Sequence, residues 1–188
     1  MNRSVKKLAY AAMFAVLNYV AFAYAKISIP TSPTSSTAIH LANAVVVLSA
    51  WALGPVYGGL AGAVGLSIAD FMDPRYITSA PKTFLMKFMI GFVAGKVAEK
   101  IQLDKSAEKG EMVRKSAISA ACGLGFNVIF DPIIGYFYKR YLLKVPAEAM
   151  SIIMTWSAGI TALNGLICLI VAVVLYLSLH NYIRGMKQ

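Results

Sequence analysis

Residues 38–72 read AIHLANAVVVLSAWALGPVYGGLAGAVGLSIADFM, with the pair Gly54-Pro55 near the middle. Apolar residues fill about 38–53 before the pair and about 56–72 after it, and no Asp, Glu, Lys or Arg occurs before Asp70. Proline lacks a backbone N–H and kinks or breaks a helix when it lies in the helix interior. The stretch therefore predicts two consecutive apolar helices separated by a tight break.

The composition of the whole chain agrees with this local pattern. Of its 188 residues, 59% are hydrophobic and only 14% are charged, with a mean hydropathy of +0.66. Soluble domains carry about 25% charged residues. We therefore expect one integral membrane domain over residues 1–188, rather than a disordered chain or a coiled coil. The net charge of +10 suits loops that orient membrane helices better than it suits a nucleic-acid partner, and we expect none.

Hydropathy predicts an all-α bundle of six transmembrane helices. A bilayer core about 30 Å thick needs roughly 20 apolar residues per helix. The predicted spans are about 8–25, 38–53, 56–72, 83–98, 117–143 and 150–182, and a mixed-charge cytoplasmic linker covers 99–115.

The distribution of basic residues predicts that the N- and C-termini are both cytoplasmic. Cytoplasmic loops are richer in Lys and Arg than outer loops. With the N-terminus inside, the outer loops receive only Lys26, Arg75, Lys82, Lys139, Arg140 and Lys144, and more basic residues lie inside. A cleavable signal peptide is the alternative, because Lys6 and Lys7 precede an apolar run ending at Ala23-Tyr24-Ala25.

Polar residues within the predicted spans share one depth, near the outer face. Ionisable groups inside a bilayer cost about 2.5–3.5 kcal/mol each on insertion scales, so they mark partners or function. Their common depth predicts a polar cavity open to the outside. The candidates are His40, Asn43, Asp70, Lys87, Asn127, Asp131 and Asn164, with Phe84 and Trp156 as aromatic groups that could stack on a planar ligand.

Structural roles for these residues remain open. Asp131 and Lys87 could neutralise each other, since buried charges are usually paired. His40 could be an interfacial anchor, and Phe84 and Trp156 could belong to aromatic belts at the membrane surface. Asp73 fits an ordinary outer-loop cluster with Arg75.

Motifs for enzymatic chemistry are missing from the sequence. It contains no G-x-x-x-x-G-K-[ST] phosphate loop, no H-E-x-x-H and no G-x-S-x-G. Cys122 and Cys168 lie in apolar runs, and with His40 and His180 they lack the spacing of a metal site. We expect no enzyme, no catalytic residue, no bound metal and no cofactor.

The ordered motifs of this chain resemble those of one transporter family. Over essentially its whole length the sequence is similar to the substrate-binding S component of energy-coupling factor (ECF) vitamin transporters. The motifs are Ala11-x-x-x-Ala15, Ile39-His40-Leu41-Ala42-Asn43, Leu53-Gly54-Pro55-x-Tyr57-Gly58, Asp70, and Ala80-Pro81-x-Thr83-Phe84-x-x-Lys87 followed by Gly91.

The resemblance implies that several subunits act together, each with its own function. Such a protein captures a water-soluble vitamin outside a prokaryotic cell membrane, with the first outer loop, here residues 26–37, as a lid. Ala11 and Ala15 would contact a membrane coupling subunit, and two cytoplasmic ATPases would drive release inside. The ligand contacts would come from His40, Asn43, Asp70, Phe84, Lys87, Asn127, Asp131, Trp156 and Asn164.

The substrate expected from this resemblance is a form of vitamin B6 (pyridoxine, pyridoxamine or pyridoxal), and next hydroxymethylpyrimidine. A small ring with amine and hydroxyl groups suits a carboxylate such as Asp131 and nearby amides. A riboflavin S component is the alternative, although the acidic Asp-Phe-Ser-type stretch before the second helix is missing. A stand-alone solute facilitator or assembly subunit is a second class, and an enzyme acting on lipid head groups is a third.

Overall fold

The computed structural model describes residues 3–32 and 35–187 and contains six α-helices and one β-hairpin in those ranges. In chain order the elements are α1 (Arg3–Tyr24), β1 (Lys26–Ser32), β2 (Ser35–His40), α2 (Ala42–Leu53), α3 (Pro55–Phe71), the 3-10 turn η1 (Ile77–Ser79), α4 (Ala80–Lys100), the 3-10 turn η2 (Leu103–Lys105), α5 (Lys109–Phe137), the π-helical turn η3 (Tyr138–Leu142) and α6 (Ala147–Lys187).

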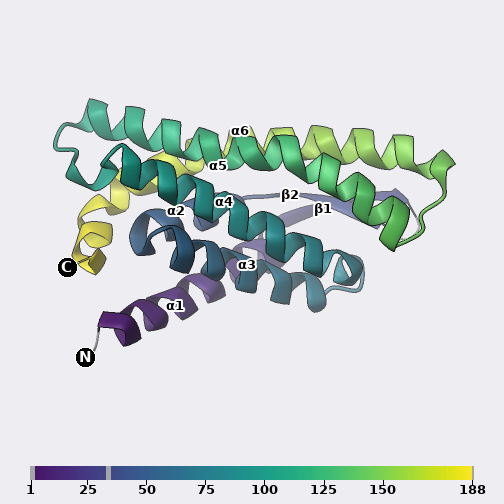
Figure 1. Cartoon of the computed structure of the whole chain (residues 1–188), viewed down its shortest axis with the longest axis horizontal. Coiled ribbons are helices and arrows are strands. Elements are labelled where there is room, and N and C mark those ends of the chain that lie inside the picture. Colours follow the sequence, from purple (N-terminus) through teal and green to yellow (C-terminus); the bar gives the residue numbers. More distant parts are fainter. Residues whose placement is uncertain (1–2, 33–34, 188) are drawn as a thin grey trace.

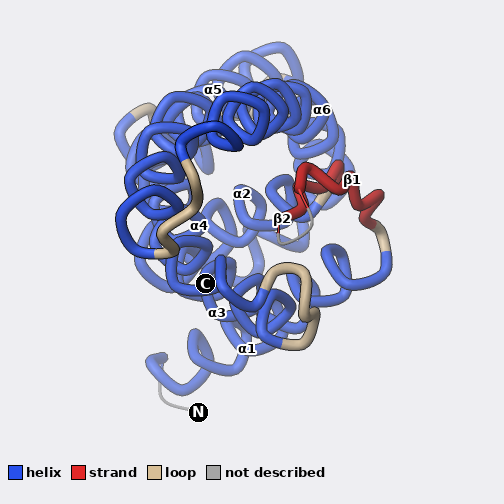
Figure 2. Tube along the Cα trace, turned by 90° about the vertical axis from the view of Figure 1, so that its right-hand side faces the viewer, coloured by secondary structure: helices blue, strands red, loops and turns tan. Residues whose placement is uncertain are grey.

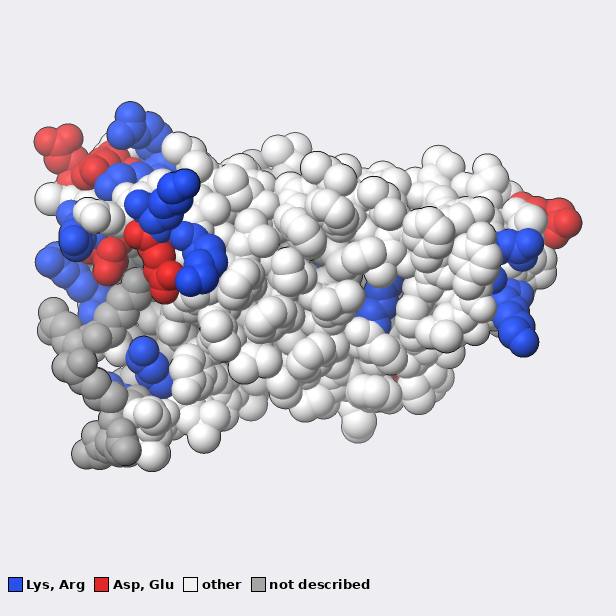
Figure 3. Space-filling model, in the orientation of Figure 1, with Lys and Arg blue, Asp and Glu red and all other residues white. Residues whose placement is uncertain are grey.

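The molecule is elongated, and the helices run mainly along its long axis (Figure 1). Both ends of the chain lie at the same end of the molecule, together with the α4–α5 connection, whereas the α5–α6 connection lies at the opposite end (Figure 1). Charged side chains gather at the two ends of the face drawn in Figure 3, and the long middle section is almost uncharged. This pattern is that of a membrane-embedded protein.

Three of the described helices are long and apolar enough to cross a bilayer: Ser4–Tyr24, Lys109–Leu142 and Ala147–Met186. Helix α2 is apolar but, at 12 residues and about 1.5 Å per residue, spans only about 18 Å. The predicted all-helical bundle of apolar helices is therefore present, while the count of six full spans stays a prediction.

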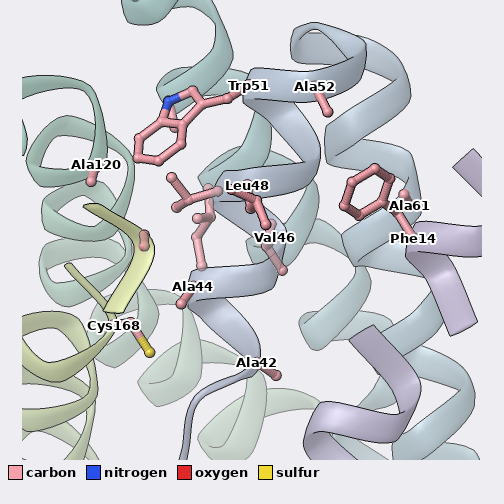
Figure 4. Close-up of a cluster of buried hydrophobic side chains, with 14 of the residues drawn as sticks. Phe14, Ala42, Ala44, Val46, Leu48, Trp51, Ala52, Ala61, Ala120 and Cys168 are labelled. Atoms are coloured by element: carbon pink, nitrogen blue, oxygen red, sulfur yellow. The ribbon is translucent and has the colours of Figure 1, made fainter. Parts of the chain in front are cut away.

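Helix α2 lies in the centre of the bundle and supplies much of the hydrophobic core (Figure 4). Its side chains are buried on nearly all sides, including Val46, Val47 and Trp51. The Trp51 indole N–H donates to Ser119 Oγ at 2.8 Å, and its ring lies edge-on to Tyr176 at 5.1 Å. This packing explains why an apolar helix too short to span the bilayer is stable here.

Glycines set the close contacts between α3 and its neighbours. Gly54 has φ +87° between α2 and α3, a backbone conformation that residues with a Cβ rarely adopt. A Cβ on Gly58 would overlap the backbone of Ala50 in α2, and one on Gly65 would overlap the Ala15 carbonyl in α1. The glycine-rich sequence of α3 thus lets two helices approach its backbone directly.

The segment before α2 differs from the sequence prediction. Residues 26–37 were expected to be a loop and 38–53 a helix, but β1 and β2 form an antiparallel hairpin that runs through Ala38 to His40. Alternating Ile27 and Ile29 opposite Ile39 and Thr37 are typical strand residues. The hairpin lies between α6 and α1 in the end-on view of Figure 2, so tertiary contacts support an element with weak local signals.

Other boundaries shift by several residues. The predicted linker 99–115 is shorter, because α4 continues to Lys100 and α5 starts at Lys109. Helix α5 ends at Phe137, and the wider π turn η3 completes the predicted span to Leu142. Charged residues can continue a helix outside the bilayer, so hydropathy marks the membrane segment rather than the helix ends.

Candidate functional site

A polar cavity of about 100 Å³ lies between β2, η1 and helices α1 to α6. It is lined by Phe22, Ser36, Thr37, Ala38, His40, Asn43, Leu66, Asp70, Tyr76, Ser79, Lys82, Thr83, Lys87, Asn127, Asp131, Lys139, Ser157, Thr161 and Asn164. Five of these side chains are charged, although the surrounding helices are largely apolar.

One ion pair spans the cavity between α4 and α5. Lys82 Nζ lies 2.8 Å from Asp131 Oδ1, and both side chains are 12% exposed. Asn127 precedes Asp131 by one helical turn and lines the same space. Asp131 is therefore neutralised by Lys82, and not by Lys87 as the sequence alternative proposed.

Asp70 and Lys87, two further charges that line the cavity, are not paired with each other within 4.0 Å. Asp70, near the end of α3, accepts a 2.6 Å hydrogen bond from Thr83 Oγ1. Lys87 follows Thr83 by one turn of α4 and also lines the cavity. Within the described residues no ion pair within 4.0 Å joins Lys87 to any carboxylate. The cavity therefore holds a carboxylate and an ammonium group separated from each other.

Three further polar atoms face no partner. His40 Nδ1, Asn43 Oδ1 and Asn127 Oδ1 are buried and make no hydrogen bond in the described structure. All three residues line the cavity. Buried polar atoms are normally hydrogen-bonded, so an unpaired set around one space suggests a bound group that satisfies them.

Asn164 joins the hairpin to α6. Its Oδ1 accepts from the His40 backbone N–H at 3.1 Å, and its Nδ2 donates to the Ala38 carbonyl at 2.8 Å. Cys168, one turn further along α6, contacts the His40 carbonyl at 3.4 Å. Asn164 therefore positions β2 over the cavity and uses both amide atoms to do so.

Aromatic rings and a second ion pair anchor the outer part of the hairpin. The Phe22 ring lies edge-on to His40 at 5.0 Å and to Tyr76 at 5.7 Å, while the Tyr76 hydroxyl donates to the Thr37 carbonyl at 3.1 Å. At the start of β1, Lys26 Nζ lies 2.8 Å from Asp73 Oδ2. The Arg75 guanidinium, with Lys26, holds the pKa of the Asp73 carboxyl well below its usual range.

Seven of the nine ligand candidates meet at this cavity: His40, Asn43, Asp70, Lys87, Asn127, Asp131 and Asn164. Phe84 and Trp156 do not line it, and they are 42% and 52% exposed. The aromatic-belt alternative fits these two residues, because an exposed ring in a membrane bundle faces lipid or headgroups. Hydrophobicity could not separate the two roles, since a stacking ring and a lipid-facing ring have the same residue type.

Two lysines assigned to outer loops belong to the cavity instead. Lys82 lies in the first turn of α4 and Lys139 in the π turn η3, and both line the space. Each lysine lies at the edge of an apolar segment, and a lysine in such a position is usually assigned to the adjoining loop. The available signal in the sequence was the closeness of Lys82 to Thr83 and of Lys139 to Asp131 along the chain. Using this signal would require knowing in which direction side chains point near the helix ends.

Ala11 packs inside the bundle, and Ala15 is partly buried against α3. Ala11 is 8% exposed, and Ala15 is partly buried with its carbonyl at Gly65 of α3. The expected contact of these residues with a partner subunit stays a prediction. The contacts of this alanine pair with α3 favour the alternative role of a small-xxx-small pair, which is close packing between helices.

No group of three or more His, Cys, Asp or Glu side chains able to hold a metal is found in residues 3–32 and 35–187. The residues that line the cavity offer hydrogen-bonding groups and charges of both signs. Such a site can bind a small polar solute.

Comparison with known proteins identifies the family. The protein-family model described as "ECF-type riboflavin transporter, S component" matches residues 2–181. This chain belongs to that family of transporter S components. The expectation drawn from the ordered motifs is therefore confirmed, and the family is one of transport proteins rather than enzymes. Among curated proteins, none matches this chain.

Two solved structures share the fold. One, described as the S component of a bacterial ECF transporter, aligns with a TM-score of 0.61 and 20% identity over 95% of this chain and 98% of its own. The other, the S component for biotin from an ECF-type ABC transporter, aligns with a TM-score of 0.58 and 19% identity over 93% and 92%. At these identities the similarity establishes the fold and leaves the ligand to the site.

Proposed function

We propose that this protein is the substrate-capture subunit of an ECF-type importer and that its substrate is a single-ring vitamin B6 compound. The observation that carries the proposal is the cavity of about 100 Å³, which combines charges of both signs with unpaired amide oxygens. Pyridoxine, pyridoxamine and pyridoxal each carry polar groups all around the ring, both in the ring and on its substituents. Hydroxymethylpyrimidine has similar chemistry and is the next candidate.

The size of the cavity favours a small ligand. Its volume of about 100 Å³ is somewhat below the roughly 150 Å³ of a cavity that binds benzene, so even one substituted ring would need the cavity to widen, and a larger ligand would need it to widen more. Phe22 and Tyr76 present ring surface along the same wall. Binding one ring would require a smaller outward shift of β2, which lines the cavity, than binding of a larger ligand.

Riboflavin is the second candidate, because the matching family model is described by that vitamin. Its three fused rings and sugar-like chain exceed the present cavity, so its entry would require the hairpin or η1 to move outward. Binding of riboflavin therefore implies a larger structural change than binding of pyridoxine.

We further propose that the protein works in a prokaryotic cell membrane with a membrane coupling subunit and two cytoplasmic ATPases, as its family membership implies. The cavity end of the bundle would face outward, with both termini in the cytoplasm. The chain contains no phosphate-binding loop, so energy for release would come from these partners.

Calorimetry on the detergent-purified protein tests the substrate. The panel is pyridoxine, pyridoxamine, pyridoxal, hydroxymethylpyrimidine, thiamine and riboflavin. We expect one-to-one binding of a B6 form, weakened by Asn43→Ala and Asn127→Ala, which remove two unpaired oxygens. Tight binding of riboflavin alone would replace the proposed substrate.

A transport assay tests the alternative of a stand-alone facilitator. Solute uptake by the isolated protein in vesicles without ATPases would support a facilitator instead of a capture subunit.

A further inference from the structure

Four of the five charges that line the cavity divide into one ion pair, Lys82 with Asp131, and two groups that form no ion pair within 4.0 Å, Asp70 and Lys87. Lys82 and Asp131 are bridged at 2.8 Å and neutralise each other. Asp70 accepts a hydrogen bond from the Thr83 hydroxyl, and Lys87 has no carboxylate within 4.0 Å among the described residues. A separated carboxylate and ammonium inside a membrane bundle are costly unless something lies between them.

Asp70 and Lys87 reach the cavity from two neighbouring helices. Asp70 is 3% exposed and lies near the end of α3, with its carboxylate held by Thr83. Lys87 lies one turn deeper on α4 than Thr83. A lysine side chain is flexible and could reach a neighbouring carboxylate, yet here it faces the cavity. The Asp70 carboxylate and the Lys87 ammonium group therefore line the same cavity from the neighbouring helices α3 and α4.

We infer that the cavity binds a bipolar ligand that bridges these groups, with an ionised oxygen at Lys87 and a cationic or N–H-donating group at Asp70. The inference rests on the proposed capture function and specifies the chemical class of its substrate. The ligand would supply both missing partners at once, because its opposite charges lie about one ring apart.

A 3-hydroxypyridine ring meets this requirement. Its ring nitrogen takes up a proton as its hydroxyl loses one, so a neutral compound carries a separated positive and negative charge. Riboflavin in its ordinary neutral form lacks such separated charges, and thiamine carries a permanent positive charge. The bipolar arrangement therefore distinguishes among solutes of the panel by charge as well as by size.

The first test compares unliganded stabilities. Lys87→Met removes a charge that has no carboxylate partner, so we expect a melting temperature equal to or higher than that of the unchanged protein. Lys96→Met, at an exposed lysine 3.6 Å from Glu99, is the control for loss of a lysine elsewhere. A markedly lower melting temperature for Lys87→Met than for Lys96→Met would show that Lys87 has a structural partner, and would overturn the inference.

The second test measures affinity and asks whether Lys87 contacts the ionised oxygen of the ligand and whether Asp70 contacts its ring nitrogen. The probes are pyridoxine, its 3-O-methyl ether, which cannot form the ionised oxygen, and the analogue with a ring C–H in place of the nitrogen. We expect Lys87→Met and Asp70→Asn each to weaken pyridoxine about ten- to a hundredfold, as loss of a charged hydrogen bond does. Lys87→Met should change affinity for the ether by less than about threefold, and Asp70→Asn likewise for the ring analogue.

The outcomes separate the two proposals. If a vitamin binds and Lys87→Met leaves its affinity unchanged, the bipolar inference fails while the capture function stands. If no compound in the panel binds the unchanged protein, the proposed substrate fails, and the unliganded melting comparison still decides whether Lys87 lacks a partner. Equal weakening of all three probes by one variant would indicate a general disturbance of the cavity and would also contradict the inference.

Discussion

At the scale of single residues, the polar groups of the bundle fall into two kinds that hydropathy alone does not separate. Lys82 and Asp131 satisfy each other across the cavity. Asn43 and Asn127 retain unpaired oxygens. The first kind contributes to the stability of the fold, and the second kind is available to a ligand. Substitution should therefore affect stability in one case and binding in the other.

Lys82→Met tests the first kind. The change leaves the Asp131 carboxylate without its 2.8 Å partner, and removal of one member of a buried ion pair costs about 3–5 kcal/mol. We expect a large fall in the free energy of unfolding measured in detergent. The double variant Lys82→Met with Asp131→Leu should recover much of it, because no charge is then left alone. A small effect of the single change would indicate that Lys139 takes over the pairing.

At the scale of elements, the hairpin depends on its neighbours. The strands β1 and β2 form a two-stranded sheet, and an isolated hairpin is marginally stable in water. Here α6 holds β2 through Asn164, and the α3–η1 connection holds β1 through Asp73. These attachments hold both strands of the hairpin in place, and β2 lines the cavity.

Asn164→Ala should loosen the hairpin. It leaves the His40 N–H and the Ala38 carbonyl without partners, which costs about 1–3 kcal/mol. We expect lower stability in denaturant and faster amide hydrogen exchange in β2. Thr155→Ala on the same helix is the control, because its hydroxyl bonds only to its own helix at Ser151. Unchanged exchange in β2 would show that the aromatic contacts alone hold the strand.

The contact between α1 and α3 gives a second prediction for the elements. Gly65→Ala would place a Cβ against the Ala15 carbonyl, and such overpacking costs about 1–3 kcal/mol. Gly125→Ala in α5 is the matched control, since no atom lies within 4 Å of the added carbon. We expect only the Gly65 variant to melt at a lower temperature. Equal behaviour of both variants would mean that α1 can shift without loss.

At the scale of the whole molecule, charge and topology agree. The two termini and the α4–α5 connection share one end of the bundle, and charged side chains cluster at both ends of the face in Figure 3. Basic residues favour the cytoplasmic side. The end that carries the termini is therefore the one we expect in the cytoplasm, with the cavity near the opposite surface.

Cysteine labelling tests this orientation. In a Cys122→Ser background, Ala147→Cys at the α5–α6 connection should react with a membrane-impermeant maleimide in intact cells. Ala107→Cys at the α4–α5 connection should react only after the membrane is permeabilised. Both positions are exposed, which makes them comparable. The reverse labelling pattern would place the cavity on the cytoplasmic side and contradict uptake from outside.

The membrane character, the break at Gly54 and the shared depth of the polar residues follow from sequence, because hydropathy and helical spacing are local properties. The hairpin, the partner of Asp131 and the burial of Ala11 required the tertiary structure. Each depends on contacts between segments far apart in the chain: Asn164 with β2, Lys82 with Asp131, and α1 with α3. A charge or an alanine has the same local signal whether it meets a ligand, lipid or another helix, and only the assembled bundle selects among them.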